Sequence, residues 1–331
     1  MPVESTTPST DVKPSIGGTT EAAPVLMTIL SAVNSSTSSP AVISITLLAT
    51  KRLGIMGAGN IGLEFATLYS RLGIQVTVFD GAPMILGRFD PEIAEMAKDY
   101  MEEDGIRFVL STQINRVSKN NQDIVVITDQ GDFTFDNVLY ATGRKPNIEG
   151  LGLENTSIEL TERGAIKVDD YCQTSVPSVF AVGDVNGGLQ FTYISLDDYR
   201  IVNGVLNGNP QYSLRDRQVV PTSMFLNPPL AQVGLTETEA KAKKLNYLSK
   251  TIPVAAMPRG HVNVDLRGAF KVIVDKDSKQ IQGATLFGAE AHELINMVKM
   301  AMDNAIPATY FQNQIFTHPT MAENFNDLFT F

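Results

Sequence analysis

The sequence has few of the residues that build disulfide frameworks or nucleic-acid interfaces. Its 331 residues contain one cysteine, Cys172, so a disulfide within one chain is excluded, and the low cysteine content fits a reducing compartment. The formal net charge is −10 and lysine and arginine are not clustered, which argues against nucleic acid or an anionic membrane as a partner. We therefore expect a cytoplasmic protein with no nucleic-acid partner, no membrane partner and no metal site.

Long hydrophobic runs are also missing. The run APVLMTILSAV, in the first fifty residues, is too short to span a bilayer. As a secretory signal it lacks a basic start, because three acidic residues and only one lysine, Lys13, precede it. Residues 1–50 are otherwise rich in serine, threonine and proline and contain no arginine, and this composition predicts a disordered or extended leader.

A regular order of strands and helices begins at Lys51. With 43% hydrophobic and 19% charged residues, the chain is long enough for two or three packed domains. We predict a strand at RLGIM, a turn at GAGNIG and a helix at LEFATLYSRLG. A second strand is predicted at IQVTVFD, an amphipathic helix at PEIAEMAKDYMEEDG, and further strands at IRFVLSTQINRVSKN and DIVVITDQGDFTFDNVLYATG, with a turn across DQGD.

The glycine turn predicts dinucleotide binding. Gly57 allows the tight turn out of the strand, Gly59 lets the backbone approach a pyrophosphate, and Gly62 lets the helix pack closely on the strand. The phosphates would then meet the positive N-terminus of the helix. The motif alone is a weak signal, but here it follows a strand, opens a helix and precedes an acidic residue, Asp80, at about the expected distance. A purely structural glycine turn is the alternative.

Asp80 bears on the choice of dinucleotide. A carboxylate accepts a hydrogen bond from the ribose 2′-hydroxyl, whereas a 2′-phosphate at contact distance would be repelled by about 1 to 4 kcal/mol. This favours NADH over NADPH. Arg88 lies close enough in sequence to soften the preference, unless it is a solvated loop arginine. The residues expected to bind the nucleotide are Gly57, Ala58, Gly59, Asn60, Ile61, Gly62, Glu64 and Asp80.

Four ordered motifs resemble those of one enzyme family. The chain contains GAGNIGLEFA, LYATGRKPN, TSVPSVFAVGDV and IFTHPTMAENFNDLF, in the order and spacing seen in the pyridine nucleotide-disulfide oxidoreductases. These are FAD-dependent enzymes related to dihydrolipoyl dehydrogenase, glutathione reductase and mercuric reductase. The C-terminal part is most similar to the branch that includes reactive-chlorine-resistance and hypothiocyanous acid reductases. The resemblance extends from Lys51 to the C-terminus.

The resemblance implies an α/β fold. It would consist of a Rossmann-like NAD-binding lobe, the remnant of an FAD-binding lobe and an α+β C-terminal dimerisation domain, through which we expect a homodimer. The expected boundaries are a leader at 1–50, the NAD(P)-binding domain at 51–143, the C-terminal part of the FAD-binding domain at 144–219 and the dimerisation domain at 220–331.

The resemblance also implies two further ligand contacts. Gly143, in the ATG turn, would lie near the nicotinamide nucleotide, and Asp184, in the VGD turn, would hydrogen-bond the ribityl chain of FAD. From the residues alone, we predict at SVFAVGDV a buried parallel strand that stops at Gly183, so that Asp184 stands where ligands of such sheets bind. A helix N-cap is the alternative role for Asp184.

His318 and Glu323 are the expected catalytic residues. The resemblance implies that the His-Pro pair carries the imidazole into the partner's active site, as an acid and base toward a redox dithiol, and that the glutamate orients it. A positioned imidazole that acts as a general acid or base typically increases the reaction rate about 10² to 10⁴-fold. A capping box, with Thr320 at N-cap and Glu323 at N3, would explain the glutamate by helix stability alone, and both roles can hold. His292, in a helix, and His261, in a glycine-flanked loop, are expected to be structural.

The chain departs from the family in two features. It has no second G-x-G-x-x-G and no pair of cysteines four residues apart, so we interpret it as N-terminally truncated. Cys172 lies in the stretch DDYCQTSVPS, which resembles a protein surface, and is expected to be an ordinary free cysteine.

Three functional interpretations follow. The first is an FAD-dependent NAD(P)H oxidoreductase that passes hydride to FAD and on to a disulfide or small-molecule oxidant; FAD binding by this chain alone is its least supported part. The second is a non-catalytic, NADH-binding and dimer-forming remnant. The third is a diaphorase-like enzyme with loosely held flavin and no dithiol. We expect the NAD lobe and the dimerisation domain to fold best, because each has enough sequence for its own core.

Overall fold

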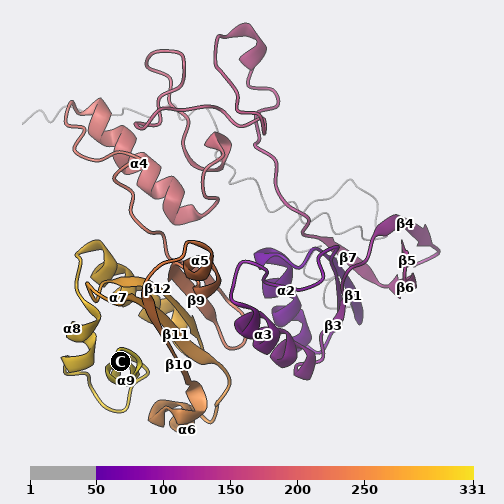
Figure 1. The fold of residues 1–331 in the computed structure, drawn as a ribbon. Coiled ribbons are helices and arrows are strands. Elements are labelled where there is room, and N and C mark those ends of the chain that lie inside the picture. Colours follow the sequence, from indigo (N-terminus) through magenta and orange to yellow (C-terminus); the bar gives the residue numbers. More distant parts are fainter. Residues whose placement is uncertain (1–49) are drawn as a thin grey trace, which may run out of the picture.

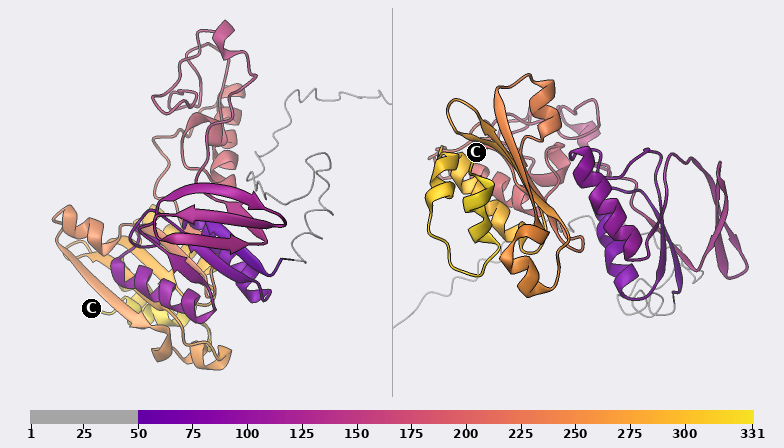
Figure 2. Two further views of the ribbon diagram at one scale, coloured as in Figure 1. Left: turned by 90° about the vertical axis from the view of Figure 1, so that its right-hand side faces the viewer. Right: turned by 60° about the horizontal axis from the view of Figure 1, so that its bottom comes forward.

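The computed structural model describes residues 50–331, which form three units (Figure 1). We name them the parallel-sheet unit (residues 50–143), the connecting segment (144–219) and the C-terminal unit (220–331). The connecting segment lies above the other two units in Figure 1, and Figure 2 shows the same arrangement from two further directions. Apart from Thr50, the predicted leader lies outside the described residues.

The parallel-sheet unit contains a four-stranded parallel sheet with the order β3-β2-β1-β7. Its strands are β1 (Arg52–Met56), β2 (Gln75–Phe79), β3 (Arg107–Val109) and β7 (Asn137–Tyr140). The helices α2 (Asn60–Arg71) and α3 (Pro91–Glu103) connect β1 to β2 and β2 to β3. The central strand β1 is almost entirely buried, as expected for a parallel strand covered on both faces. The strand, turn and helix predicted from Lys51 onward are confirmed.

A three-stranded antiparallel sheet in the same unit packs on the parallel sheet. Its strands are β4 (Ile114–Asn120), β5 (Asp123–Thr128) and β6 (Gly131–Phe135), in the order β4-β5-β6. The turn predicted across DQGD joins β5 to β6, where Thr128 pairs with Gly131. Phe79 of the parallel sheet meets Phe133 and Phe135 edge to face, at ring-centroid distances of 5.0 and 5.8 Å. These aromatic contacts fix the small sheet against the large one.

The C-terminal unit is a five-stranded antiparallel sheet with helices, as predicted. The strand order is β10-β11-β12-β9-β8. The strands are β8 (Thr222–Met224), β9 (Leu230–Gly234), β10 (Tyr247–Pro253), β11 (Ala269–Asp275) and β12 (Ile281–Phe287). The α-helices are α5 (Glu237–Ala242), α6 (Pro258–Asn263), α7 (Ala291–Asp303), α8 (Ala308–Asn313) and α9 (Phe325–Leu328), and the 3₁₀ helices are η3 (Val254–Ala256) and η4 (Ala322–Asn324).

Two hydrophobic cores hold the C-terminal unit in place. One lies between its sheet and the helices α7, α8 and α9, with Phe325 packed against Phe270 and Phe311. The other is shared with the parallel-sheet unit, because Met224 and Phe287 belong to the same buried cluster as the α2 and α3 side chains. The two units therefore fold around a common core, and the mixed parallel and antiparallel sheets confirm the α/β fold class.

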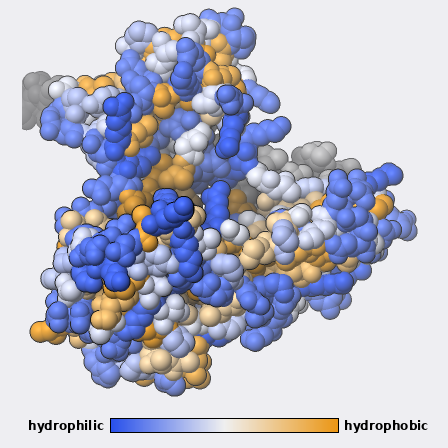
Figure 3. All heavy atoms as spheres, in the orientation of Figure 1, coloured by the Kyte–Doolittle hydropathy of each residue, from blue (hydrophilic) through white to orange (hydrophobic). Residues whose placement is uncertain are grey.

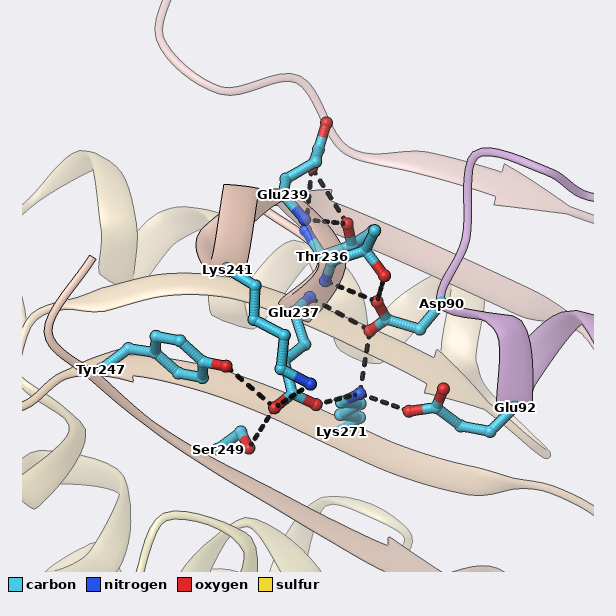
Figure 4. A network of polar contacts seen from close by, with 10 residues as sticks. Asp90, Glu92, Thr236, Glu237, Glu239, Lys241, Tyr247, Ser249 and Lys271 are labelled. Carbon is cyan, nitrogen blue, oxygen red and sulfur yellow. Dashed lines mark hydrogen bonds and ion pairs between the residues drawn. The ribbon is translucent and has the colours of Figure 1, made fainter. Parts of the chain in front are cut away.

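A buried lysine also joins these two units. Lys271 of β11 is 3% exposed, and its ammonium lies 2.9 Å from Asp90 and 2.7 Å from Glu237 and also contacts Glu92. Figure 4 shows these four residues, which we call the Lys271 clasp. Burial disfavours the ammonium, but the three carboxylates outweigh it and raise the pKa of Lys271. Despite its own partial burial, Glu237 has its pKa lowered to about 2 by hydrogen bonds from Lys271 and other partners.

The connecting segment has helices but no strand. It contains α4 (Thr192–Leu206), η1 (Leu153–Asn155) and η2 (Gly183–Asn186). The strand predicted at SVFAVGDV is therefore wrong, since Phe180 makes only an isolated bridge to Gln173 and the next turn is 3₁₀-helical. A buried parallel strand needs a neighbouring parallel strand for its backbone groups, and within residues 50–331 this stretch pairs with no strand and meets only the antiparallel bridge at Gln173.

Candidate functional site

The glycine turn lies at the carboxyl end of β1, where the chain enters α2. Gly57 has a φ of 103°, and a Cβ there would lie 2.5 Å from the carbonyl oxygen of Ala141, so only glycine fits. A Cβ on Gly62 would lie 1.9 Å from the carbonyl oxygen of Gly57, so this glycine permits the close packing of α2 on β1. A Cβ on Gly59 would meet no atom within 4 Å, which leaves the backbone open to a ligand. These are the three tasks that a dinucleotide turn requires.

The N-terminus of α2 and Asp80 converge on this turn. No side chain caps α2, so its first N–H groups have neither an intrahelical nor a side-chain acceptor. Asp80 follows β2 directly, and its two carboxylate oxygens accept hydrogen bonds from the N–H groups of Ala58 at 2.7 Å and Ala82 at 2.8 Å. Each carboxylate oxygen keeps a further lone pair for a ligand hydroxyl. The turn can therefore offer donors to phosphate and an acceptor to a ribose.

Glu64 links this helix to the C-terminal unit. Its Oε1 accepts a hydrogen bond of 3.0 Å from the backbone N–H of Phe225, which follows β8. Burial raises the pKa of Glu64, and the Phe225 hydrogen bond opposes that increase. Phe225 was not among the expected site residues, and a lone aromatic between two apolar residues is no signal of a site in the sequence.

Gly143 and Asp184 are brought together through Arg144. Gly143 has a φ of 124° where the chain leaves the parallel-sheet unit. The guanidinium of Arg144, the next residue, donates a hydrogen bond of 2.9 Å to the Asp184 carboxylate. Asp184 lies within the 3₁₀ helix that Val182 precedes, so the N-cap alternative is wrong. Arg144 was not among the expected site residues, although it belongs to the LYATGRKPN motif. Its positive charge directly after the turn is the sequence signal that could have identified it as a site residue.

Asp198 of α4 holds the turn that carries Asp184. It is 1% exposed and accepts hydrogen bonds from the Gly183 N–H at 2.8 Å and the Asn186 amide at 3.0 Å. The Arg217 guanidinium adds a contact of 2.5 Å. The buried carboxylate is thus fully paired. No sequence signal marks Asp198, because an acidic residue in a helix usually faces solvent.

His318 and Glu323 form a close pair near the C-terminus. Nδ1 of His318 lies 2.7 Å from Oε2 of Glu323, and the His318 side chain is 69% exposed. Oε1 of Glu323 accepts a hydrogen bond of 3.1 Å from the Thr320 N–H, and the Thr320 hydroxyl accepts one of 3.2 Å from the Glu323 N–H. The two reciprocal bonds of the predicted capping box are present, but the N-cap of η4 is Met321, so Thr320 lies one residue before its predicted position. One carboxylate thus serves both the imidazole and the backbone.

The remaining candidates have structural surroundings. Cys172 is a free thiol, as predicted, but it is buried rather than exposed, and this burial raises its pKa to about 12. His261 lies in α6 rather than in a loop, with Nε2 2.9 Å from a backbone carbonyl, and His292 lies in α7. Within residues 50–331, no helix has the length and hydrophobicity to cross a membrane, and no three His, Cys, Asp or Glu residues are grouped as metal ligands.

Two family models match the chain. The model described as pyridine nucleotide-disulphide oxidoreductase matches residues 7–198, and the dimerisation-domain model of the same family matches residues 220–329. The probable pyridine nucleotide-disulfide oxidoreductase RclA of Escherichia coli is 43% identical to this chain, over 84% of the chain and 63% of its own length. A mercuric reductase of Lysinibacillus sphaericus is 32% identical, over 82% of this chain and 50% of its own length.

A solved structure agrees with these matches. The HOCl-induced flavoprotein disulfide reductase RclA from Escherichia coli is similar in structure with a TM-score of 0.82 and 42% identity, over 85% of this chain and 64% of that protein. The chain thus spans less than two thirds of the length of these relatives. The resemblance found in the four motifs is confirmed.

Proposed function

Because the chain belongs to the pyridine nucleotide-disulphide oxidoreductase family, we propose that it carries the NADH-binding and dimer-forming parts of an FAD-dependent NAD(P)H oxidoreductase. When bound, the cofactors supply the redox chemistry, in which a hydride passes from NAD(P)H to FAD and then to a disulfide or a small oxidant. The description of the relative RclA as a flavoprotein disulfide reductase supports this proposal. The chain itself supplies the groups that bind the nucleotide and a group that can move a proton.

The glycine turn is the observation that carries the proposal. Gly59 leaves open space beside the uncapped N-terminus of α2, where a pyrophosphate would meet free N–H groups and the positive end of the helix. Asp80 stands beside the same turn as the acceptor for a ribose hydroxyl. Its charge would repel a 2′-phosphate by about 1 to 4 kcal/mol, so NADH is the preferred nucleotide. The described residues thus fit a pyridine dinucleotide.

His318 is the proton-transfer group in this proposal, and Glu323 orients it. The Glu323 carboxylate accepts a hydrogen bond from the Nδ1–H of His318, which leaves Nε2 free to take up or give a proton. Because the side chain is 69% exposed, Nε2 is accessible to a substrate or a second subunit. In a homodimer through the C-terminal unit, which the match to the dimerisation-domain model supports, this imidazole would be available to the partner subunit.

The described residues fit FAD less well than NADH. The expected ribityl contact, Asp184, is already paired with Arg144, and the connecting segment has no sheet. Cys172 is the only cysteine of the sequence, and with a pKa raised to about 12 it forms little thiolate at neutral pH. These observations favour a second candidate function, an NADH-binding and dimer-forming unit that does not turn over by itself.

A visible absorption spectrum separates the two candidates. The purified full chain is supplied with FAD, desalted, and then mixed with NADH without oxygen. A flavin band that survives desalting and bleaches on NADH addition supports an oxidoreductase that holds both cofactors. NADH binding without a flavin band supports the NADH-binding unit, and no binding of either cofactor contradicts both.

A further inference from the structure

We propose that Asn326 is a positioning residue for His318, because its side-chain amide fixes the point at which the loop that carries the imidazole leaves α8. The inference rests on the proposed proton-transfer role of His318 and adds a residue that lies outside the His318–Glu323 pair. It depends on the way in which α8 ends, on the three carbonyls that the Asn326 amide contacts and on the exposure of the loop.

The chain leaves α8 abruptly. Gln314, the C-cap residue, has extended backbone angles of φ −71° and ψ 148°, so the chain no longer follows the helix. The N–H of the next residue, Ile315, donates to the Gln314 side chain at 3.2 Å rather than to a carbonyl of the helix. The last four carbonyls of an α-helix have no partner within the helix, so those of α8 need donors from elsewhere.

The side chain of Asn326 supplies these donors. Its amide nitrogen lies 2.8 Å from the carbonyl oxygen of Phe311 and 3.2 Å from that of Gln312, both in the last turn of α8. A third contact of 2.9 Å reaches the carbonyl of Gln314, the first residue of the loop. An amide has two N–H groups, so at least one of them is shared between two carbonyls. One side chain thus closes the helix and holds the start of the loop.

Asn326 is itself held in place by the fold. The preceding residue, Phe325, is fully buried in the core of the C-terminal unit. The ammonium of Lys250, in β10, donates hydrogen bonds to the carbonyls of Asp327 at 2.6 Å and Thr330 at 2.7 Å, which tie the end of α9 to the sheet. The Thr330 hydroxyl also donates a bond of 2.7 Å to the Asn326 carbonyl. The Asn326 amide is therefore presented from a fixed backbone.

The loop of residues 314–320 is exposed around the imidazole. Ile315 is 92% exposed, and the side chain of His318 is 69% exposed. Phe316 packs against Phe325, with 6.2 Å between the ring centroids, so the first part of the loop rests on the same segment as its polar anchor. Figure 3 shows hydrophobic and hydrophilic atoms mixed over the visible face of the C-terminal unit, and single exposed apolar side chains are common on such a surface. Beyond Phe316, the path to His318 is set by the backbone rather than by burial.

The hydrogen bond between His318 and Glu323 tolerates little displacement. Its Nδ1–Oε2 distance is 2.7 Å, and such bonds weaken steeply once the atoms move beyond about 3.2 Å or out of line. If the start of the loop shifts, the imidazole moves while the Glu323 carboxylate stays with η4. A longer contact, 3.4 Å from the Arg259 guanidinium to the Pro319 carbonyl, supports the loop less than the Asn326 bonds do. Asn326 thus keeps the Nδ1–H of His318 on the carboxylate.

The test is nitrogen NMR of the full chain with isotope-labelled histidine, in which His318→Gln identifies the His318 signals among the three histidines. In the neutral imidazole of the unaltered chain, we expect the proton on Nδ1, where Glu323 accepts its hydrogen bond. In Asn326→Ala this preference should be lost, so that the Nε2–H form becomes populated. Exchange of the Thr320 amide proton with solvent should become about tenfold faster. Asn326→Asp keeps the shape of the side chain but replaces the donor by an acceptor, and it should have the same effects.

Asn313→Ala is the matched control. The Asn313 amide donates a hydrogen bond of 2.8 Å to the Thr309 carbonyl, and this bond stays within α8. The control therefore removes an asparagine amide of the same kind from the same helix without changing the start of the loop. The tautomer of His318 and the exchange rate of the Thr320 amide should both stay as they are in the unaltered chain.

Three outcomes would overturn the inference. An unchanged tautomer and exchange rate in both Asn326 variants, even with a lower melting temperature, would show that Asn326 only closes the end of α8. Equal changes in Asn313→Ala would show that a general loosening of α8, and not the loss of the Asn326 amide, moves the imidazole. Absence of the Nδ1–H form in the unaltered chain would contradict the proposed role of His318 itself, and this result is distinct from the other two.

Discussion

The connecting segment and the two units below it are stabilised in different ways. The lower units place their backbones in sheets, share a buried core and are joined by the Lys271 clasp. The connecting segment has only isolated bridges, two 3₁₀ turns and the helix α4, and α4 leaves several large apolar side chains exposed: Tyr193, Leu196, Tyr199 and Leu206. The comparison shows that an apolar stretch such as SVFAVGDV forms a strand only where neighbouring strands complete its hydrogen bonds.

The largest effect is expected from Lys271→Met, which removes the cation between the lower units. Asp90, 2% exposed, and Glu237, 18% exposed, would then lie near each other without a positive partner. We expect the free energy of unfolding of the lower units to fall by about 4 kcal/mol, as measured by urea titration. Lys241→Met is the control, because Lys241 contacts the same Glu237 but its side chain is 65% exposed. This variant should lower the free energy of unfolding by less than about 1 kcal/mol. Equal effects of the two variants would contradict the role of the clasp.

The same clasp predicts an acid dependence. The pKa of Glu237 is lowered from 4.5 to about 2, so the stabilisation by its charge is fully present above pH 4.5 and is lost as the pH falls toward 2. In Lys271→Met the pKa of Glu237 should rise toward its ordinary value, and the acid-induced loss of stability should become shallower. A slope between pH 4.5 and 2 that is identical in both proteins would contradict this assignment.

Local patterns were sufficient to predict the lower units. The glycine turn, the strand before Asp80 and the DQGD hairpin are each specified by residues close in sequence, and all three form as expected. The strand expected at SVFAVGDV failed because its existence depends on partners elsewhere in the chain. Cys172 was misplaced for a related reason, since polar neighbours suggested a surface, whereas its burial depends on distant residues that cover it.

The candidate site likewise contains some contacts between residues close in sequence and others between residues far apart. The Glu323 bonds to Thr320 and His318 span three and five residues, and the sequence motif was enough to predict the pairing. Phe225 contacts Glu64 across 161 positions, and Arg217 contacts Asp198 across 19, so neither pair has a local signature. Long-range contacts between ordinary residue types therefore had to come from the structure.

A smaller and more local effect is expected from Asp198→Asn, which weakens the connecting segment. The variant loses the charge that holds Arg217 and keeps an oxygen that can accept from Gly183. The free energy of opening the connecting segment should therefore fall by about 2 kcal/mol. Such a loss would raise the open fraction of this segment about 30-fold, which the labelling rate of the buried Cys172 by a thiol reagent measures. The denaturant midpoint of the lower units should stay unchanged. Asp170→Asn is the control, because Asp170 pairs with Arg215, whose side chain is 82% exposed.

If Asp198→Asn lowers the midpoint of all units together, the connecting segment is not an independent unit, and the contrast with the lower units fails. If Cys172 labels at the same rate in both proteins, the Asp198 contacts do not control access to the thiol. Either result would show that the segment gains its order from the lower units rather than from its own polar network.

The smallest effect is expected at Glu323, where two roles of one carboxylate can be separated. Glu323→Ala removes the acceptor for the Thr320 N–H and should lower the free energy of unfolding by about 1 kcal/mol. Glu323→Gln keeps an acceptor oxygen for Thr320 but removes the charge next to His318. It should therefore lower the free energy of unfolding by less than about half as much as Glu323→Ala does. Thermal melting of both variants measures the difference. An equal loss in both would mean that the charge toward the imidazole, rather than the capping bond, is what stabilises the start of η4.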